Sequence, residues 1–159
     1  MTTATPSRPT LVAWLGYGGL LPFVATALVS WLEPNHRSFW QDMLVGYGAV
    51  ILSFVGALHW GFAMVHPDTA GKSMNGMYAW SVMPSLLGWA ALLVHPGAAV
   101  TLLMAGFLAQ YRQDVRLTRV LALPPWYLPL RLQLTLVACA CLASVYVLTP
   151  NAPPSLLNA

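Results

Sequence analysis

Long apolar runs alternate along the chain with short polar segments. Four long stretches carry no formal charge, at 9–32, 43–67, 73–111 and 132–159. A helix needs about 20 apolar residues to cross roughly 30 Å of hydrocarbon. Three of the four stretches therefore have the length of one membrane crossing, and 73–111 is too long for one.

A turn signal, His95-Pro96-Gly97, divides the long stretch. A hairpin at this point gives two helices in place of one. The pattern then predicts an all-α integral membrane protein, a bundle of five transmembrane helices over 10–32, 42–65, 75–94, 98–118 and 130–149. The end segments 1–9 and 150–159, rich in Pro, Thr, Ser and Asn, are predicted to be flexible tails.

The basic residues predict the orientation of this bundle. With five crossings, one face of the membrane receives six of the seven Lys and Arg side chains, and Arg37 alone lies on the other. Cytoplasmic segments carry an excess of Lys and Arg, so we expect the N-terminus inside and the C-terminus outside. The first helix is expected to be an uncleaved anchor, because its stretch is long for a signal peptide and only Arg8 precedes it.

Composition agrees with a lipid environment and excludes several functions. Only 7% of the 159 residues are charged, against roughly a quarter in soluble domains. The net charge of +3 is dispersed between apolar runs, so no nucleic-acid partner is expected. Cys139 and Cys141 project to different sides of a helix and form neither a redox pair nor a zinc site. No catalytic residue, metal or cofactor is predicted from any motif.

His59 is the one ionisable side chain expected away from loops and helix ends, which makes it a functional candidate. Inside the membrane its ring needs a polar partner. Pro84 has no N–H, so the carbonyl of Trp80 loses its helical hydrogen bond. We expect His59 to bond to that carbonyl or to the hydroxyl of Ser81. The contact could hold helices together, or serve a proton relay or a ligand; a haem site lacks a second axial ligand facing the first.

Two helix faces are candidates for packing. Small residues recur every fourth position in the second predicted helix, at Ala49, Ser53, Ala57 and Gly61, which suits a partner helix or self-association. His59 projects to the other side of the same helix, so this helix is expected at the centre of the bundle. Glycines in the first helix, at 16, 18 and 19, could pack in the same way or loosen that helix.

A basic face marks the end of the fourth predicted helix. Its arginines fall at i, i+4 and i+7, and lipid phosphates would offset their mutual repulsion; topology anchoring alone is the alternative. Asp114 lies off this face and is expected to pair with Arg131 or to cap a neighbouring helix. The predicted head-group residues are Arg112, Arg116, Arg119, Arg131, Trp126 and Tyr127.

Three stretches together resemble a known family. They are YGAVILSFVGALHWG at 47–61, SVMPSLLGW at 81–89 and PWYLPLRLQLT at 125–135. In this order and spacing they resemble the uncharacterised bacterial and mitochondrial inner-membrane proteins that include transmembrane protein sixty-nine. The resemblance covers most of the chain and implies a multi-pass protein of the cell inner (cytoplasmic) membrane, with no established catalytic residues. The shared positions are His59, Trp60, Gly61, Pro84, Trp89, Trp126, Tyr127 and Arg131.

The function expected from these features is non-enzymatic: an accessory or assembly factor that packs against partner helices or lipids. The alternative is a small transporter or ligand carrier with an inner-side cavity around His59. Its candidate binding residues are His59, Trp60, Tyr78, Trp80, Ser81 and Pro84. A polar-lined cavity of about 300 Å³ or more around His59 favours the carrier. A filled core with an outward-facing ladder of small residues favours the accessory role.

Overall fold

A computed structural model describes residues 10–65 and 72–147. Within them the chain is all helical and has no strand, as the sequence predicts. The elements are α1 (Thr10–Gly18), α2 (Leu21–Leu32), the 3-10 turn η1 (Pro34–His36), α3 (Arg37–Val65), α4 (Lys72–Ala91), α5 (Pro96–Val120) and α6 (Tyr127–Val147). The predicted tails 1–9 and 150–159, with Arg8, lie outside the described residues.

The first predicted helix is broken into α1 and α2. Pro22 has no N–H and cannot bond to the carbonyl of Gly18 four residues before it, while it fits the first turn of a new helix. Gly18 and Gly19, weak helix formers, lie at the break. Of the two roles that the sequence allowed for these glycines, loosening the helix is therefore the one observed at the break.

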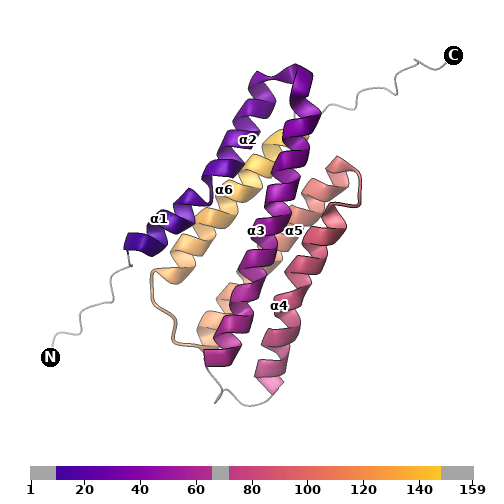
Figure 1. Ribbon diagram of the computed structural model, residues 1–159. Coiled ribbons are helices and arrows are strands. Elements are labelled where there is room, and N and C mark those ends of the chain that lie inside the picture. Colours follow the sequence, from indigo (N-terminus) through magenta and orange to yellow (C-terminus); the bar gives the residue numbers. More distant parts are fainter. Residues whose placement is uncertain (1–9, 66–71, 148–159) are drawn as a thin grey trace.

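The predicted hairpin at His95 is confirmed. Pro96 occupies the first position of α5, and the Gly97 backbone N–H donates to Nδ1 of His95 at 3.4 Å, which caps the helix. The chain also reverses direction between α2 and α3, between α3 and α4, and between α5 and α6 (Figure 1). Counting α1 and α2 as one, five antiparallel segments result.

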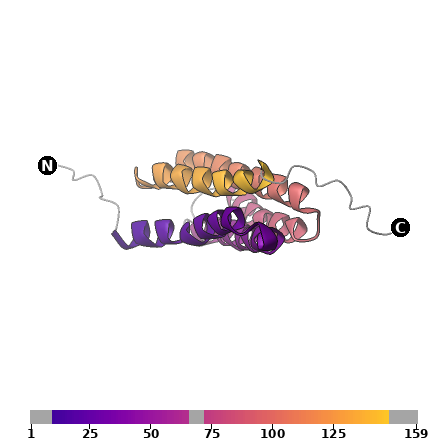
Figure 2. The ribbon, with the colours of Figure 1, turned by 90° about the horizontal axis from the view of Figure 1, so that it is seen from above.

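The segments form two layers. Helices α1 to α4 make one layer, and α5 and α6 make the other (Figure 2). Helix α3 contacts α2, α4, α5 and α6, so the predicted central position of the second segment is confirmed. Where the layers meet, the main apolar core includes the fully buried side chains of Phe23, Leu44, Leu52, Leu103 and Leu142.

Close contact between α3 and α4 depends on glycine. A Cβ atom on Gly56 would come 2.7 Å from Cγ of Pro84, and one on Gly88 would come 2.9 Å from the carbonyl oxygen of Ala49. The same Gly88 position lies 3.3 Å from Oγ of Ser53. Neither glycine could carry a side chain without the helices moving apart.

This contact changes the interpretation of the small-residue ladder. Ala49 and Ser53, expected to face a partner chain, pack against α4 of their own chain because Gly88 leaves room for them. Ala57 and Gly61, further along α3, are exposed. Only this second half of the ladder remains free for another helix.

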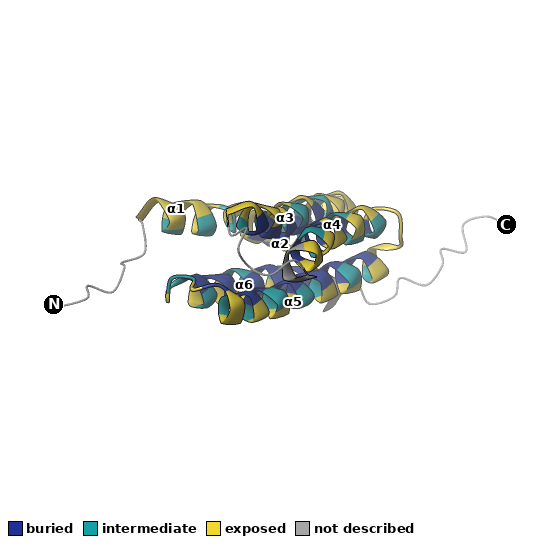
Figure 3. Ribbon diagram, turned by 90° about the horizontal axis from the view of Figure 1, so that it is seen from below, coloured by how far each residue is buried: buried dark blue, intermediate teal, exposed yellow. Residues whose placement is uncertain are grey.

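Buried residues line the facing sides of the two layers, and the outer surface carries exposed ones (Figure 3). Many exposed side chains are large and apolar, for example Trp14, Phe54, Leu86 and Trp89. Among the described residues, three helical segments are long and apolar enough to cross a membrane: Thr10–Leu32, Pro34–Val65 and Tyr127–Val145. Such an exterior suits hydrocarbon as the surrounding solvent.

Candidate functional site

Six polar side chains from four helices meet between the layers, and we call them the polar network. Helix α5 contributes two of them four residues apart, and so does α6; that spacing places each pair on one helical face. The fully buried members are His59, Gln110 and Asp114. The network consists of His59 on α3, Trp80 on α4, Gln110 and Asp114 on α5, and Tyr127 and Arg131 on α6.

Trp80 orients the side chain of Gln110. The indole Nε1–H donates to Oε1 of Gln110 at 2.8 Å, and an indole nitrogen can only donate. The amide oxygen therefore faces α4 and the amide nitrogen faces α3. Nε2 lies 2.9 Å from Nδ1 of His59 and donates to the carbonyl of Val55 at 3.4 Å.

The orientation of Gln110 also determines the tautomer of His59. Because the amide nitrogen only donates, Nδ1 must accept, and a neutral ring then carries its proton on Nε2. Nε2 lies 3.6 Å from Oδ1 of Asp114, beyond hydrogen-bond distance. The histidine therefore directs its N–H side toward a carboxylate with a small gap between them.

Asp114 holds the other half of the network. Nε of Arg131 donates to Oδ2 at 2.7 Å, and the hydroxyl of Tyr127 donates to Oδ1 at 3.2 Å. The carboxylate charge is thus compensated by one buried guanidinium. Of the two roles expected for Asp114, pairing with Arg131 is confirmed.

The predicted partner of His59 is wrong. Its ring is bonded to Gln110, whereas the hydroxyl of Ser81 donates to the carbonyl of Tyr78 at 2.7 Å, inside α4. Trp80 takes part through its indole and not through its carbonyl. The long side chain of Gln110 reaches from the other layer into the space between α3 and α4. The depth of each residue along its own helix does not predict such a contact.

His59 is also not the single ionisable group inside the bundle. Asp114 and Arg131 are buried beside it, so the assignment of Arg131 and Tyr127 to lipid head groups is wrong. The reason is the charge of Asp114, which draws both donors inward. Trp126 is half-buried, and the side chains of Arg112, Arg116 and Arg119 are exposed.

The remaining candidate binding residues do not gather around His59. The rings of Trp60 and Tyr78 pack edge to face with centroids 5.0 Å apart, and Trp60 is about half exposed, at 48%. Pro84 is buried against the Gly56 position of α3. These side chains join α3 to α4 and do not surround a common space with the histidine.

Gln110 is the network residue that sequence reasoning missed. It lies four residues before Asp114, on the side of α5 opposite the arginine face. That spacing of an amide and a carboxylate on one face is a usable signal for a buried polar pair. What each would contact depends on helices far away in the sequence.

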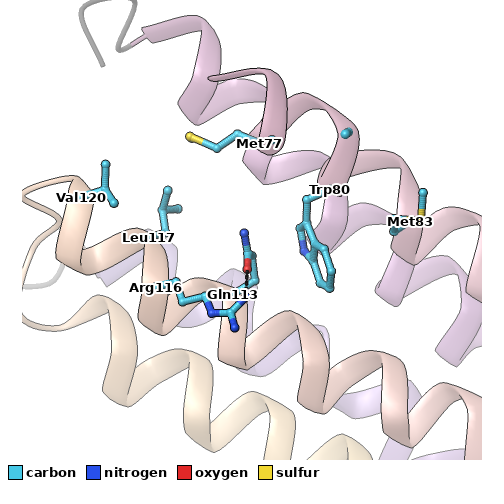
Figure 4. A pocket seen from close by; sticks show the side chains of 9 residues that line it. Met77, Trp80, Met83, Gln113, Arg116, Leu117 and Val120 are labelled. Carbon is cyan, nitrogen blue, oxygen red and sulfur yellow. Dashed lines mark hydrogen bonds between the residues drawn. The ribbon is translucent and has the colours of Figure 1, made fainter. Parts of the chain in front are cut away.

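A cavity of about 380 Å³ lies between α4 and α5, next to the network (Figure 4). Trp80 on α4 faces Gln113 and Arg116 on α5 across it. His59 does not line this cavity, but the indole of Trp80 forms a wall between cavity and network. Among residues 10–65 and 72–147, no group of three or more His, Cys, Asp or Glu side chains is placed to hold a metal ion.

Residues 8–147 match the family described as protein of unknown function DUF3429. The chain belongs to this family. The match covers every described residue of the bundle, including all six network residues.

Two curated relatives of this DUF3429 chain bear the name transmembrane protein 69. The chain is 33% identical to the one from Xenopus tropicalis over 137 residues, 85% of the chain and 53% of that protein. It is 29% identical to the one from Mus musculus over 133 residues, 82% of the chain and 53% of that protein. The chain thus spans about half the length of these relatives, and no solved structure matches it. The resemblance seen in the sequence is confirmed, and the chain is a membrane protein of this family.

Proposed function

We propose that the protein is a non-enzymatic accessory or assembly factor of the cell inner (cytoplasmic) membrane that packs against a partner helix. In this proposal the chain crosses the bilayer five times, through α1 with α2, then α3, α4, α5 and α6. The N-terminus lies inside, on the side of the arginine-bearing end of α5. The five antiparallel segments and the position of Arg112, Arg116 and Arg119 support this arrangement.

The observation that carries the proposal is the exposure of α1. This helix buries none of its residues in the chain. Its apolar side chains Leu11, Trp14 and Leu15 are 68%, 74% and 68% exposed. An apolar helix that adds no buried residue to the core of its own chain is available to pack against another helix.

Contacts with α6 hold α1 in place even so. The hydroxyl of Tyr17 donates to Oε1 of Gln133 on α6 at 2.6 Å. A Cβ on Gly16 would lie 3.4 Å from Leu134, an ordinary contact distance. Helix α1 therefore lies against α6, with its large apolar side chains exposed.

The polar network supports a structural role for the buried polar groups. Each of its side chains is engaged by another member from a different helix. Interhelical hydrogen bonds of this kind join helices in lipid at about 1 kcal/mol each. The network thus provides a rigid support on which the outer helices are arranged.

Purification in mild detergent, followed by identification and quantification of co-purifying proteins, tests the proposal. The informative variant is Leu11→Ala with Trp14→Ala, on α1. The matched control is Leu86→Ala with Trp89→Ala on α4, which removes the same two side-chain types at the same spacing from another exposed face. We expect one stoichiometric partner that is lost from the α1 variant and kept by the control. Absence of a stoichiometric partner, or equal loss from both variants, would contradict the proposal.

A second candidate, a small transporter or ligand carrier, has one observation in its favour. The cavity between α4 and α5, about 380 Å³, has the volume of a ligand site and reaches Trp80. His59, Trp60 and Tyr78 are not part of its lining. The carrier would therefore use a site beside the network and not one centred on the histidine.

A further inference from the structure

We propose that the cavity between α4 and α5 is a binding site for an anionic phospholipid. Its phosphate binds Arg116, and one acyl chain lies along Met77, Met83 and Leu117. The site rests on the proposed bilayer placement, which brings this end of the bundle to a lipid head-group layer. It does not depend on the existence of a protein partner.

The cavity has an apolar floor and an open rim. Met77 and Leu117 are buried, whereas Gly76, Met83 and Arg116 are exposed. A ligand can thus enter from the side that faces the bilayer and reach a floor of apolar side chains. Methionine side chains are flexible and polarizable, so they adapt to a chain of methylene groups.

The charge of the rim selects the ligand. Arg116 is flanked on the same helical face by Arg112 and Arg119, and all three are exposed. The one carboxylate on α5, Asp114, faces the other way and is bound to Arg131. Within the described residues no carboxylate lies at ion-pair distance from the three exposed arginines. An external anion at the rim would offset their repulsion.

Arg116 is suited to a phosphate. Its Nη1 donates to Oε1 of Gln113 at 3.5 Å, a long contact with a neutral side chain. The planar guanidinium binds phosphate oxygens in a bidentate manner that a lysine cannot reproduce. A cation at the rim with an apolar floor beside it is complementary to a phosphate joined to an acyl chain, and less so to a free inorganic anion.

Trp80 connects the site to the polar network. Its indole lines the cavity and donates to Gln110, which in turn contacts His59. An acyl chain in the cavity would cover the indole face and leave this hydrogen bond intact. Bound lipid would therefore hold the Trp80 indole in place without contacting the other network residues.

The test counts bound lipid on the full chain. The detergent-solubilised protein is titrated with phosphatidylglycerol or with phosphatidylcholine, and native mass spectrometry gives the affinity for each. Removing one basic contact is expected to weaken phosphatidylglycerol binding by about fivefold to tenfold in Arg116→Gln. The matched control Arg112→Gln loses the same charge from the same face, outside the cavity, and should change by less than twofold.

A second variant fills the cavity and leaves every charge in place. A Cβ on Gly76 meets nothing within 4 Å, so Gly76→Leu can place a side chain in the open space and also favours the helix. We expect it to weaken phosphatidylglycerol binding as strongly as Arg116→Gln, with unfolding unchanged or delayed. Normal lipid binding by Gly76→Leu, or equal losses in the two arginine variants, would overturn the site. Binding of inorganic phosphate with the affinity of the lipid would also overturn it. None of these outcomes bears on the partner lost through α1.

Discussion

At the centre of the network, the Gln110 side chain has one possible orientation because Trp80 can only donate. The consequence passes to His59, whose Nδ1 accepts and whose Nε2 carries the proton. The uncharged side chains of Trp80 and Gln110 thus determine which ring nitrogen of His59 carries the proton. This chain of contacts links α4, α5 and α3.

The tautomer of His59 can be measured directly. In ¹⁵N-histidine-labelled protein we expect a neutral ring protonated at Nε2, with the His59 signals assigned from their loss in His59→Asn. In Gln110→Leu no donor holds Nδ1, so the ring is expected to sample both tautomers. Interhelical hydrogen bonds in lipid contribute about 1 kcal/mol each, so stability should fall by about 1–2 kcal/mol. A wild-type ring protonated at Nδ1 would rule out the donor role of the Gln110 amide.

Asp114 is the most sensitive residue of the network. In Asp114→Asn the guanidinium of Arg131 stays buried without a compensating charge, which costs about 3–5 kcal/mol. The measurement is the free energy of unfolding in mixed detergent micelles. Joint replacement, Asp114→Leu with Arg131→Met, removes both charges and should recover much of the loss.

Asp42 on α3 provides the control for this experiment. Its carboxylate is exposed, so Asp42→Asn is expected to change stability by less than about 0.5 kcal/mol. If Asp114→Asn were no more harmful than Asp42→Asn, the buried pair would not be formed in the membrane-embedded protein.

At the scale of elements, α3 and α4 approach each other through glycine positions. Gly88 faces the backbone of Ala49, and Gly56 faces the ring of Pro84. Lipid offers no hydrophobic drive for helix association, so close backbone packing has to supply the attraction. These glycines are thus the reason that α3 and α4 form one layer.

Replacing a glycine that lies in close contact and replacing a glycine that faces open space should have opposite effects on stability. Gly88→Ala places a methyl group 2.9 Å from a carbonyl oxygen, and overpacking of this kind costs about 1–3 kcal/mol. Gly46→Ala, in the interior of α3, meets nothing within 4 Å and should gain about 0.5–1 kcal/mol from helix propensity. Thermal unfolding in detergent measures both. Equal shifts in the two variants would mean that α3 and α4 are further apart than described.

The helix break at Gly18 belongs to the same scale. It separates α1, which buries nothing, from α2, which buries Phe23, Ala27 and Ser30. A continuous helix would keep one direction throughout, whereas the break lets the two parts serve different surfaces. The inward face of α2 completes the core, and α1 is left exposed, as the proposed partner contact requires.

At the scale of the whole molecule, charge and topology agree. The arginine face of α5 and the segment between α5 and α6 lie at one end of the bundle, and η1 lies at the other (Figure 1). The proposed five crossings would therefore place these two ends in different compartments. Three of the segments are long and apolar enough to cross a membrane by length and composition. Helix α5 is not among them, and it carries four charged residues near its end: Arg112, Asp114, Arg116 and Arg119.

Cysteine labelling in intact cells tests this topology. Cys139 and Cys141 are first replaced by alanine, and a single cysteine is then placed by Asn35→Cys or Ala122→Cys, both at exposed positions. We expect a membrane-impermeant maleimide to label position 35 from outside, and position 122 only after the membrane is permeabilised. Labelling of both positions from the same side would contradict the five crossings.

One unbroken helix was predicted over 10–32, and its glycines left packing and loosening both open, so the break at Gly18 and Gly19 was not predicted. The sequence was enough to predict the family and the local features, namely helical segments of membrane length and the turn at His95. These follow from short-range rules, since apolar length, missing N–H groups and backbone freedom act within a few residues.

Which helix faces meet depends on how the helices pack in three dimensions. His59 and Gln110 are 51 positions apart, and Asp114 and Arg131 are 17 apart across a turn. Residue spacing places each on a face, but the choice of neighbour depends on how α3, α5 and α6 pack together. For the same reason the ladder of small residues became partly internal, and a cavity formed between α4 and α5, because those outcomes depend on the fit of whole surfaces.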